Sequence, residues 1–155
     1  MNATVVVRRG DNDDREFVHD LGRRSATSSL SAVRTARYDD VLHAFDRLVD
    51  FVYDREHAAL IAEEDGERVG FLLLLFDIPD EVTLTEQAFL AYTAVEPHAR
   101  GRGIGRALLE EAEGFARGMG RSYLSLMVTE DNAPARGLYD QAGFVTERRM
   151  MTKVL

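Results

Sequence analysis

A turn rich in glycine and arginine is the segment of this sequence best suited to binding an anion. It consists of Arg100, Gly101, Arg102, Gly103, Ile104, Gly105 and Arg106, and a helical apolar pattern follows it. Glycines let a backbone approach a ligand closely, and a helix start presents unpaired N–H groups with partial positive charge. Arginines at this end of a helix are unfavourable by about 0.3–1 kcal/mol each. We therefore expect an anion among them, with an ordinary solvent-exposed turn as the alternative.

Two common phosphate-binding motifs do not fit this turn. A dinucleotide-binding G-x-G-x-x-G needs a third glycine, but counting from Gly101 or Gly103 leads to Arg106 or Leu108. The phosphate loop of nucleoside triphosphatases also fails, because no Gly-Lys-Ser/Thr follows. The pattern that does fit is Arg-x-x-Gly-x-Gly, beginning at Arg100.

A second stretch, residues 132–144, has the pattern of a short capped helix. It reads Asn-Ala-Pro-Ala-Arg-Gly-Leu-Tyr-Asp-Gln-Ala-Gly-Phe. Asn132 is a good helix N-cap, Pro134 is accepted in a first helical turn, and Gly143 is a good C-cap. Taken alone, this stretch is explained by a short helix in which Tyr139 is a half-buried packing residue.

Taken together, the two stretches resemble the GCN5-related N-acetyltransferase (GNAT) superfamily. Arg-x-x-Gly-x-Gly is its pyrophosphate-binding signature, and the second stretch is similar to its Asn-x-x-Ala-x-x-Leu-Tyr-x-x-x-Gly-Phe signature. The likeness covers residues 85–144, whereas the first eighty residues match only in the expected order of elements. The resemblance implies an α/β fold with a mixed, mostly antiparallel central sheet flanked by about four helices. It also implies transfer of acetyl from acetyl-coenzyme A (acetyl-CoA) to a primary amine by direct attack in a ternary complex.

The resemblance also gives individual residues a role. Backbone N–H groups from Arg100 to Arg106 would hold the pyrophosphate of acetyl-CoA. The pantetheine arm would pair, like an added strand, with exposed backbone at Thr93, Ala94 and Val95, where one N–H would stabilise the oxyanion. Asn132 corresponds to a residue that bonds this arm, and Tyr139 to the usual general acid. An alkyl thiol has a pKa of about 8.5 and tyrosine about 10, so the phenol can protonate the leaving sulfur without being ionised itself.

The general base is where the sequence departs from the superfamily. Some histone-modifying members carry a glutamate at the position of Phe89. Gln87 and Tyr92 are near in sequence, and Glu86 could act through a water, although strand alternation puts Glu86 on the opposite face from Phe89 unless a bulge intervenes. A non-catalytic acyl-CoA-binding or sensing module of the same fold is therefore the main alternative. A nucleotide-binding regulatory protein is a third, and it would bind ATP or NAD instead.

Composition bounds the remaining possibilities. A chain of 155 residues with 45% apolar and 30% charged residues is typical of one globular domain, so we expect a single acetyltransferase domain over residues 1–155. The net charge of −8 argues against nucleic-acid binding and favours a cationic acceptor, such as a polyamine, an aminoglycoside or a protein N-terminus. There is no cysteine, and no metal is expected because the histidines lack ligand spacing. These are His19, His43, His57 and His98.

Neither a signal peptide nor a membrane span is expected. The longest apolar run, residues 71–76, is far short of the roughly 20 residues that cross a bilayer. A cytoplasmic location is therefore the expectation, with no membrane partner, and a homodimer is left open.

The residue pattern predicts the elements that must position these groups. Residues 69–76, the second strand of an expected hairpin, lack the alternation of apolar and polar residues. This indicates a strand that is buried on both faces of the sheet. The expected strands are Thr4–Val7, Ala58–Ala62, Val69–Phe76, Thr85–Val95, Ser122–Val128 and Phe144–Leu155. The expected helices are Asp13–Arg24, Tyr38–Tyr53, Gly103–Arg117 and Ala133–Ala142, with a loop over Ser25–Ser31.

Overall fold

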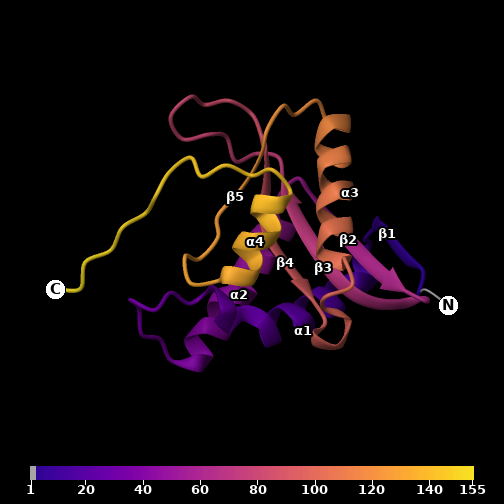
Figure 1. Ribbon diagram of the computed structural model, residues 1–155, viewed down its shortest axis with the longest axis horizontal. Helices are drawn as coiled ribbons and strands as arrows, with labels where there is room; N and C mark the ends of the chain where they lie inside the picture. The colour runs from indigo at the N-terminus through magenta and orange to yellow at the C-terminus, as the bar shows by residue number, and fades with distance from the viewer. Residues whose placement is uncertain (1–2) are drawn as a thin grey trace.

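One central sheet, in the strand order β1-β2-β3-β4-β5, organises the computed structural model, which describes residues 3–155 (Figure 1). The strands are β1 (Val5–Arg9), β2 (His57–Glu64), β3 (Glu67–Leu75), β4 (Ala88–Val95) and β5 (Leu124–Leu126). The first four strands pair antiparallel, and β5 runs parallel to β4. The predicted mixed, mostly antiparallel sheet is confirmed.

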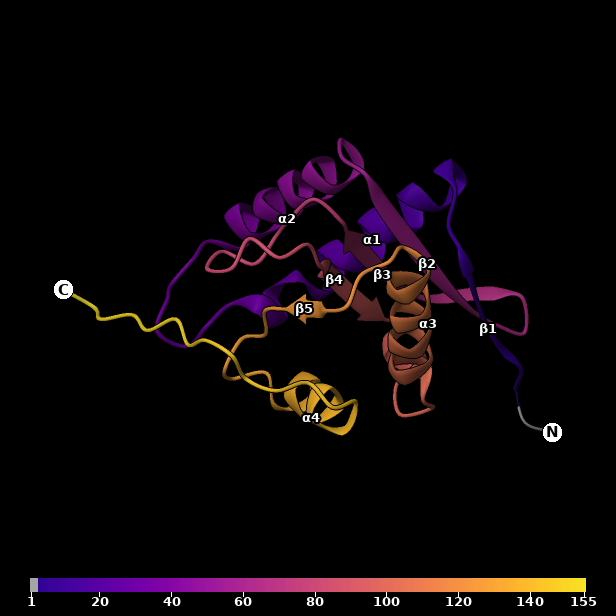
Figure 2. The same cartoon turned by 90° about the horizontal axis from the view of Figure 1, so that it is seen from above.

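Four α-helices cover the two faces of this sheet. They are α1 (Arg15–Ser25), α2 (Tyr38–Tyr53), α3 (Ile104–Gly118) and α4 (Ala133–Gln141). Short 3-10 turns lie at Asn12–Asp14, Ala26–Ser29 and Pro97–Ala99. Helices α1 and α2 pack on one face, and α3 and α4 on the other, which Figure 2 shows from above. The result is three layers with a separate apolar core on each side of the sheet.

Strand β3 explains why the hairpin arm lacks alternation. Its residues from Val69 to Leu75 are all buried. Leu72 and Leu74 belong to the core under α3, whereas Phe71 and Leu73 belong to the core under α1 and α2. Both faces of the strand are therefore covered by helices, as the sequence predicted.

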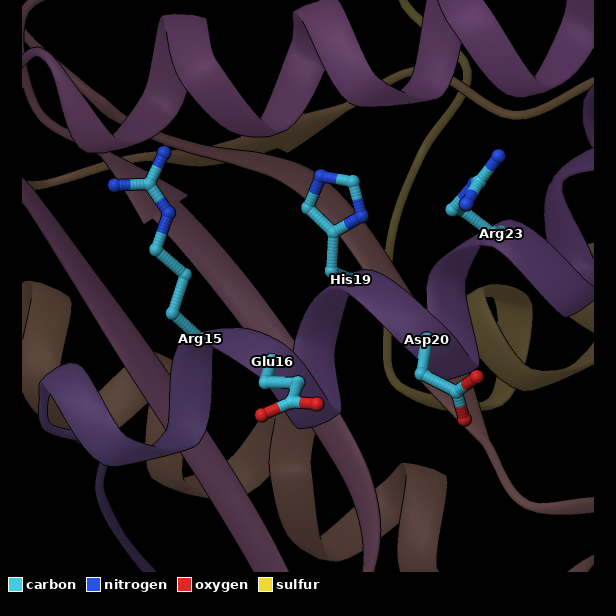
Figure 3. A pocket seen from close by; sticks show the side chains of 5 residues that line it. All are labelled: Arg15, Glu16, His19, Asp20 and Arg23. Carbon is cyan, nitrogen blue, oxygen red and sulfur yellow. The ribbon is translucent and has the colours of Figure 1, made fainter.

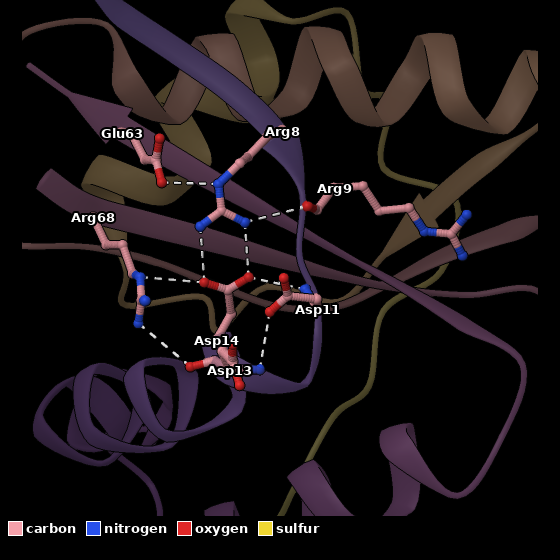
Figure 4. A network of polar contacts seen from close by, with 7 residues as sticks. All are labelled: Arg8, Arg9, Asp11, Asp13, Asp14, Glu63 and Arg68. Atoms are coloured by element: carbon pink, nitrogen blue, oxygen red, sulfur yellow. Dashed lines mark hydrogen bonds and ion pairs between the residues drawn. The ribbon is translucent and has the colours of Figure 1, made fainter. Parts of the chain in front are cut away.

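The buried carboxylate of Asp14, just before α1, forms hydrogen bonds with Arg8 of β1 and so links the two elements (Figure 4). Asp14 is 1% exposed and accepts hydrogen bonds from two nitrogens of Arg8, at 2.8 and 2.9 Å, and from the backbone N–H of Asp11. Arg68 approaches the same carboxylate at 3.2 Å, and Glu63 accepts a hydrogen bond from the Arg8 Nε. The Arg8 guanidinium lowers the pKa of Asp14 from its ordinary 3.8 to about 2.

The predicted last strand, Phe144–Leu155, is wrong. Residues 144–155 form no strand and extend away from the body of the molecule (Figures 1 and 2). Their apolar residues fall in adjacent pairs without alternation, and no backbone group of residues 145–155 is hydrogen-bonded within the described chain, so nothing there holds a strand. Strand β5 is also shorter than the predicted Ser122–Val128.

The start of β4 differs from its predicted position for a local reason. The predicted strand begins at Thr85, whereas β4 begins at Ala88. The carboxylate of Asp80 accepts the backbone N–H groups of Val82 and Thr83, and the Asp80 N–H donates to the Thr85 carbonyl oxygen. These bonds fold residues 80–85 into a turn that competes with extended structure.

Candidate active site

The glycine- and arginine-rich turn leads directly into α3 and presents free backbone donors. Gly101 and Gly103 have φ values of +76° and +82°, which side-chain-bearing residues rarely adopt, and nothing lies within 4 Å of where their Cβ atoms would be. Gly103 is the N-cap of α3 and provides no side-chain cap. Within residues 3–155, no backbone N–H of residues 101–106 has a hydrogen-bond partner. This fits a ligand with anionic oxygens at the positive end of the helix.

The arginine side chains of the turn have partners within the same chain, and two of the three partners are acidic side chains. Arg102 pairs with Glu64 at 2.6 Å, and Arg106 pairs with Glu110 at 3.1 Å. Arg100 donates from Nε to the carbonyl oxygen of Val95. These partners give the arginines a structural role that the sequence did not suggest. The backbone N–H groups are consequently the part of the turn with most capacity for a new anion.

Strands β4 and β5 separate just before the turn, which opens the backbone of β4. They pair only over Ala88–Leu90 and Leu124–Leu126. Beyond Leu90, a register shift skips Ala91 and marks a bulge, and β4 continues with β3 alone as its neighbour. One edge of β4 is therefore unpaired from this bulge to Val95, and this edge contains the predicted Thr93, Ala94 and Val95.

Not every group on this edge is free. The Thr93 hydroxyl donates to the Phe71 carbonyl oxygen at 2.8 Å, so its side chain is committed to the sheet. Ala94 is buried, and the Val95 carbonyl oxygen accepts from Arg100. What these three residues can offer a ligand is main-chain hydrogen bonding, which is what the resemblance implied.

Helix α4 carries the two remaining predicted residues to the same region. Asn132 is the N-cap, and its side-chain oxygen accepts the Ala135 N–H at 3.3 Å, which leaves its amide nitrogen free to donate. Tyr139 is 8% exposed and shares an apolar cluster with Ile104 of the turn and Leu90 of β4. The structure thus brings the turn, the opened strand and Tyr139 together.

The environment of Tyr139 keeps its phenol protonated. Burial is the largest cause that raises the pKa of Tyr139 above its ordinary value of about 10, and the neighbouring Tyr92 raises it further. Its ring packs edge-on against Phe144 at 5.6 Å, and the described residues make no hydrogen bond to its hydroxyl. A protonated, unpartnered hydroxyl is suited to giving a proton to a leaving group.

Tyr92 and Ser25 form a polar pair that sequence reasoning missed. Ser25 Oγ donates to the Gly22 carbonyl oxygen, and it lies 3.0 Å from the Tyr92 hydroxyl, which therefore donates to it. The Tyr92 ring packs against Phe45 and Phe71 on the side of α1 and α2. Tyr92 follows the bulge and packs on the α1 and α2 side of the sheet, whereas Tyr139 belongs to the core on the α3 side.

None of the residues near Phe89, where some members of the superfamily carry a glutamate, provides a general base. Phe89 packs against the core under α1 and α2. Glu86 precedes the strand, is exposed and pairs with Arg121 at 3.4 Å. Gln87 is buried and accepts a hydrogen bond from the Ser125 hydroxyl. The bulge at Ala91 comes after all three residues and does not turn Glu86 into the opening.

Two hollows on the described surface differ in how close they lie to the turn. One, of about 470 Å³, lies on the α1 surface between Arg15, His19 and Arg23 (Figure 3). Its basic side chains pair with acids of α2, Asp46 and Asp50, so it is explained by the contact between the helices. The other, of about 200 Å³, lies between α3 and α4 and begins at Arg106 of the turn.

In residues 3–155, no three side chains of the metal-ligating kind come together. Over the same described chain, no helix combines the length and apolarity needed to cross a membrane.

The three-layer α/β structure, with parallel strands that part beside a glycine-rich helix start and a buried tyrosine, is the arrangement expected for the acetyltransferase resemblance. The model of the Acetyltransferase (GNAT) family matches residues 22–144. The chain therefore belongs to the GNAT acetyltransferase family, and the resemblance in its motifs is confirmed.

Individual relatives are similar over part of the chain. An uncharacterized N-acetyltransferase of Bacillus subtilis, YhfO, is 37% identical over 91 residues, which is 59% of this chain and 60% of that protein. The streptothricin acetyltransferase of Streptomyces lavendulae is 38% identical over 80 residues, 52% of this chain and 40% of that protein. The chain thus aligns with about half of the length of these curated relatives.

A solved structure shares the fold over nearly the full chain. It is the aminoglycoside N-acetyltransferase AAC(6')-Iy in complex with CoA, with a TM-score of 0.72 and 17% identity. The match covers all of this chain and 97% of that one. At this identity the likeness concerns the fold.

Proposed function

We propose that residues 1–155 act as a single N-acetyltransferase domain that moves acetyl from acetyl-CoA to a primary amine by direct attack in a ternary complex. The observation that carries the proposal is the opening of β4 beyond Leu90, with free N–H donors at one end and Tyr139 beside it. The streptothricin acetyltransferase and the CoA-bound aminoglycoside enzyme, to which the chain is similar, support a small cationic amine as acceptor.

In our proposal, acetyl-CoA is bound mainly by backbone groups of the protein. In this proposal, N–H groups of residues 101–106 bind the pyrophosphate, and the unpaired edge at Thr93–Val95 pairs with the amides of the pantetheine arm. The free amide nitrogen of Asn132 donates to the same arm. One N–H of the β4 edge also points at the thioester oxygen, where it stabilises the negative charge that develops during attack.

The chemical step needs one proton donor and no metal. The neutral amine nitrogen forms a bond to the thioester carbonyl carbon, and the carbon–sulfur bond breaks. The Tyr139 hydroxyl gives its proton to the departing sulfur, and the proton lost by the nitrogen passes to solvent, from which the phenolate is restored. A raised pKa suits this role, since the hydroxyl is fully protonated at neutral pH.

A thiol-release assay with a panel of amines tests the proposal. Polyamines, aminoglycosides and peptides with free N-termini are offered with acetyl-CoA, while calorimetry follows CoA binding separately. Amine-dependent release of free thiol supports the enzyme. Absence of CoA binding by the folded chain would contradict the proposal.

A second candidate function is a non-catalytic acyl-CoA-binding or sensing module. Phe89, packed in the core at the position of the superfamily glutamate, is the observation that favours it. It predicts tight CoA binding with no thiol release under any acceptor. Since the two functions share the binding step, only turnover separates them.

A further inference from the structure

Tyr92 is a second phenol near the unpaired edge of β4, and the chemical step described above does not use it. It belongs to the part of β4 that no longer has β5 as its neighbour. Its side chain packs on the layer of α1 and α2, whereas Tyr139 lies in the layer of α3 and α4 (Figure 2). Tyr92 is nonetheless close enough to raise the pKa of Tyr139. The unpaired edge thus has one phenol on each face of the sheet.

The side from which the amine attacks follows from the proposed function. An arm that pairs with the β4 edge like an added strand keeps its thioester carbonyl close to the plane of the sheet. The two faces of the carbonyl then point to the two helix layers, and a nucleophile adds to one of these faces. The face toward α3 and α4 is taken by Tyr139, which is 8% exposed within that core. The amine therefore approaches from the side of α1 and α2, where Tyr92 packs.

The Tyr92 side chain is held in one orientation on that side. Its ring packs edge-on against Phe45 at 4.9 Å and is stacked with Phe71 at 6.1 Å. Phe45 in turn fills the space beside Gly22 of α1, where no side chain would fit. The Tyr92 hydroxyl is also bonded to Ser25. Both the ring and the hydroxyl are therefore positioned before any ligand binds.

The hydrogen bonds of the Tyr92 hydroxyl leave its oxygen able to accept but not to donate. Ser25 Oγ gives its only hydrogen to the Gly22 carbonyl oxygen, so Tyr92 gives its own hydrogen to Ser25, 3.0 Å away. A phenol oxygen can also accept a hydrogen bond. Within residues 3–155, no donor supplies one to Tyr92. A ligand that meets this oxygen must therefore bring an N–H or O–H of its own.

We propose that the Tyr92 oxygen accepts a hydrogen bond from an N–H of the attacking amine and so directs the nitrogen lone pair at the thioester carbon. A primary amine provides the N–H and the lone pair together, which suits a partner that only accepts. The nitrogen becomes positive as it attacks, and this strengthens the hydrogen bond in the transition state. Tyr92 takes no proton, because its own hydrogen stays in place, and the proton lost by the amine passes to solvent as above.

The loop that follows Ser25 gives this side a negative charge. The Thr129 hydroxyl donates to the Ser29 carbonyl oxygen at 2.9 Å, and the Asp131 carboxylate accepts the Ala32 N–H at 2.8 Å. These two bonds join the loop after α1 to the segment before α4. Asp131 thereby lies beside the loop that begins at the partner of Tyr92, which favours an amine that arrives as a cation before it loses its proton.

Steady-state kinetics with an amine that releases thiol test the proposal. Tyr92→Phe removes the oxygen and keeps the ring, whereas Ser25→Ala removes the same hydrogen bond and keeps the Tyr92 oxygen. We expect kcat/KM for the amine to fall about tenfold in Tyr92→Phe, as for the loss of one hydrogen bond to a charged group, and about twofold at most in Ser25→Ala. The Kd for acetyl-CoA, measured by calorimetry, should stay the same in both variants.

Tyr53→Phe is the matched control, because its hydroxyl oxygen is buried in the same layer and has no hydrogen-bond partner among the described residues. It should leave kcat/KM for the amine unchanged. Equal losses in Tyr92→Phe and Ser25→Ala would mean that the hydroxyl acts only through the bond between them. That result, or an unchanged kcat/KM in Tyr92→Phe, overturns the proposal and leaves the acetyltransferase function standing. A chain that binds acetyl-CoA but releases no thiol with any amine overturns both.

Discussion

Gly105 in the first turn of α3 lies directly against Leu138 of α4, so that a Cβ at position 105 would stand 3.1 Å from Leu138 Cδ2. Leu138 is the residue before Tyr139. The glycine- and arginine-rich turn and Tyr139 are therefore fixed relative to each other by one close contact between helices. The third glycine of the motif has a packing role here, in addition to any role toward the ligand.

Replacing this glycine should disturb both helices at once. Gly105→Leu overfills the contact, and we expect a loss of about 1–3 kcal/mol in the free energy of unfolding together with weaker acetyl-CoA binding. Gly114→Leu, in the same helix with nothing within 4 Å, is the matched control and should gain about 0.5–1 kcal/mol. Denaturant unfolding and calorimetry measure the two effects. Equal stability of the two variants would contradict a tight contact at position 105.

The left-handed glycine at the helix start should matter for binding beyond its effect on stability. Gly103→Ala and Gly120→Ala both place a side chain at positive φ with open space around it, so each should cost about 1–2 kcal/mol of folding free energy. Only Gly103 lies in the turn that we propose binds the pyrophosphate. We expect the Kd for acetyl-CoA to rise about tenfold in Gly103→Ala and to stay unchanged in Gly120→Ala, since one lost hydrogen bond to a charged group is worth about 1.5 kcal/mol or more. A parallel rise in both variants would assign the effect to stability alone.

Removing the phenol hydroxyl tests the proton donor. Tyr139→Phe should lower kcat by about 10²–10⁴-fold with little change in the KM for acetyl-CoA. Tyr123→Phe, an exposed position, serves as the control. Because burial raises the pKa of Tyr139, the natural enzyme should keep its rate until the pH exceeds about 10. Unchanged turnover in Tyr139→Phe would remove Tyr139 from the mechanism.

The buried carboxylate in the first turn should make stability depend on acid pH. The pKa of Asp14 is about 2 in the folded chain against an ordinary 3.8, so its contribution is present above pH 3.8 and is lost as the pH falls toward 2. Asp14→Asn should therefore cost about 2 kcal/mol at neutral pH. The difference from the natural chain should shrink below about pH 4. Thermal unfolding over this range, with the exposed Asp13→Asn as control, measures it.

Local patterns predicted the elements that depend on nearby residues. Helix α2 begins at Tyr38 and ends at Tyr53, as its apolar spacing indicated. The turn from Gly101 to Gly103 could be recognised because glycines directly before a helical pattern are typical of a backbone at positive φ, which both residues adopt. The capping role of Asn132 was equally local, since its side chain bonds an N–H three residues later.

Features that depend on distant residues could not be predicted in this way. The hydrogen bond between Ser25 and Tyr92 joins residues 67 positions apart, and neither side chain carries a signal of the other. Glu64, the partner of Arg102, lies 38 positions away and could not be identified, whereas Glu110 lies only four residues after Arg106 in the predicted helix. The last predicted strand failed for the same reason, because the residue types of 144–155 do not show whether a neighbouring strand is present.

The acids that hold Arg102 and Arg106 also set how acetyl-CoA binding should respond to ionic strength. A phosphate that recruits these guanidinium groups must displace Glu64 and Glu110, so one ion pair replaces another and the net number of charge contacts hardly changes. Added salt screens the old and the new pairs alike. The affinity should therefore fall only gently between dilute and physiological salt, far less steeply than three uncommitted arginines would make it.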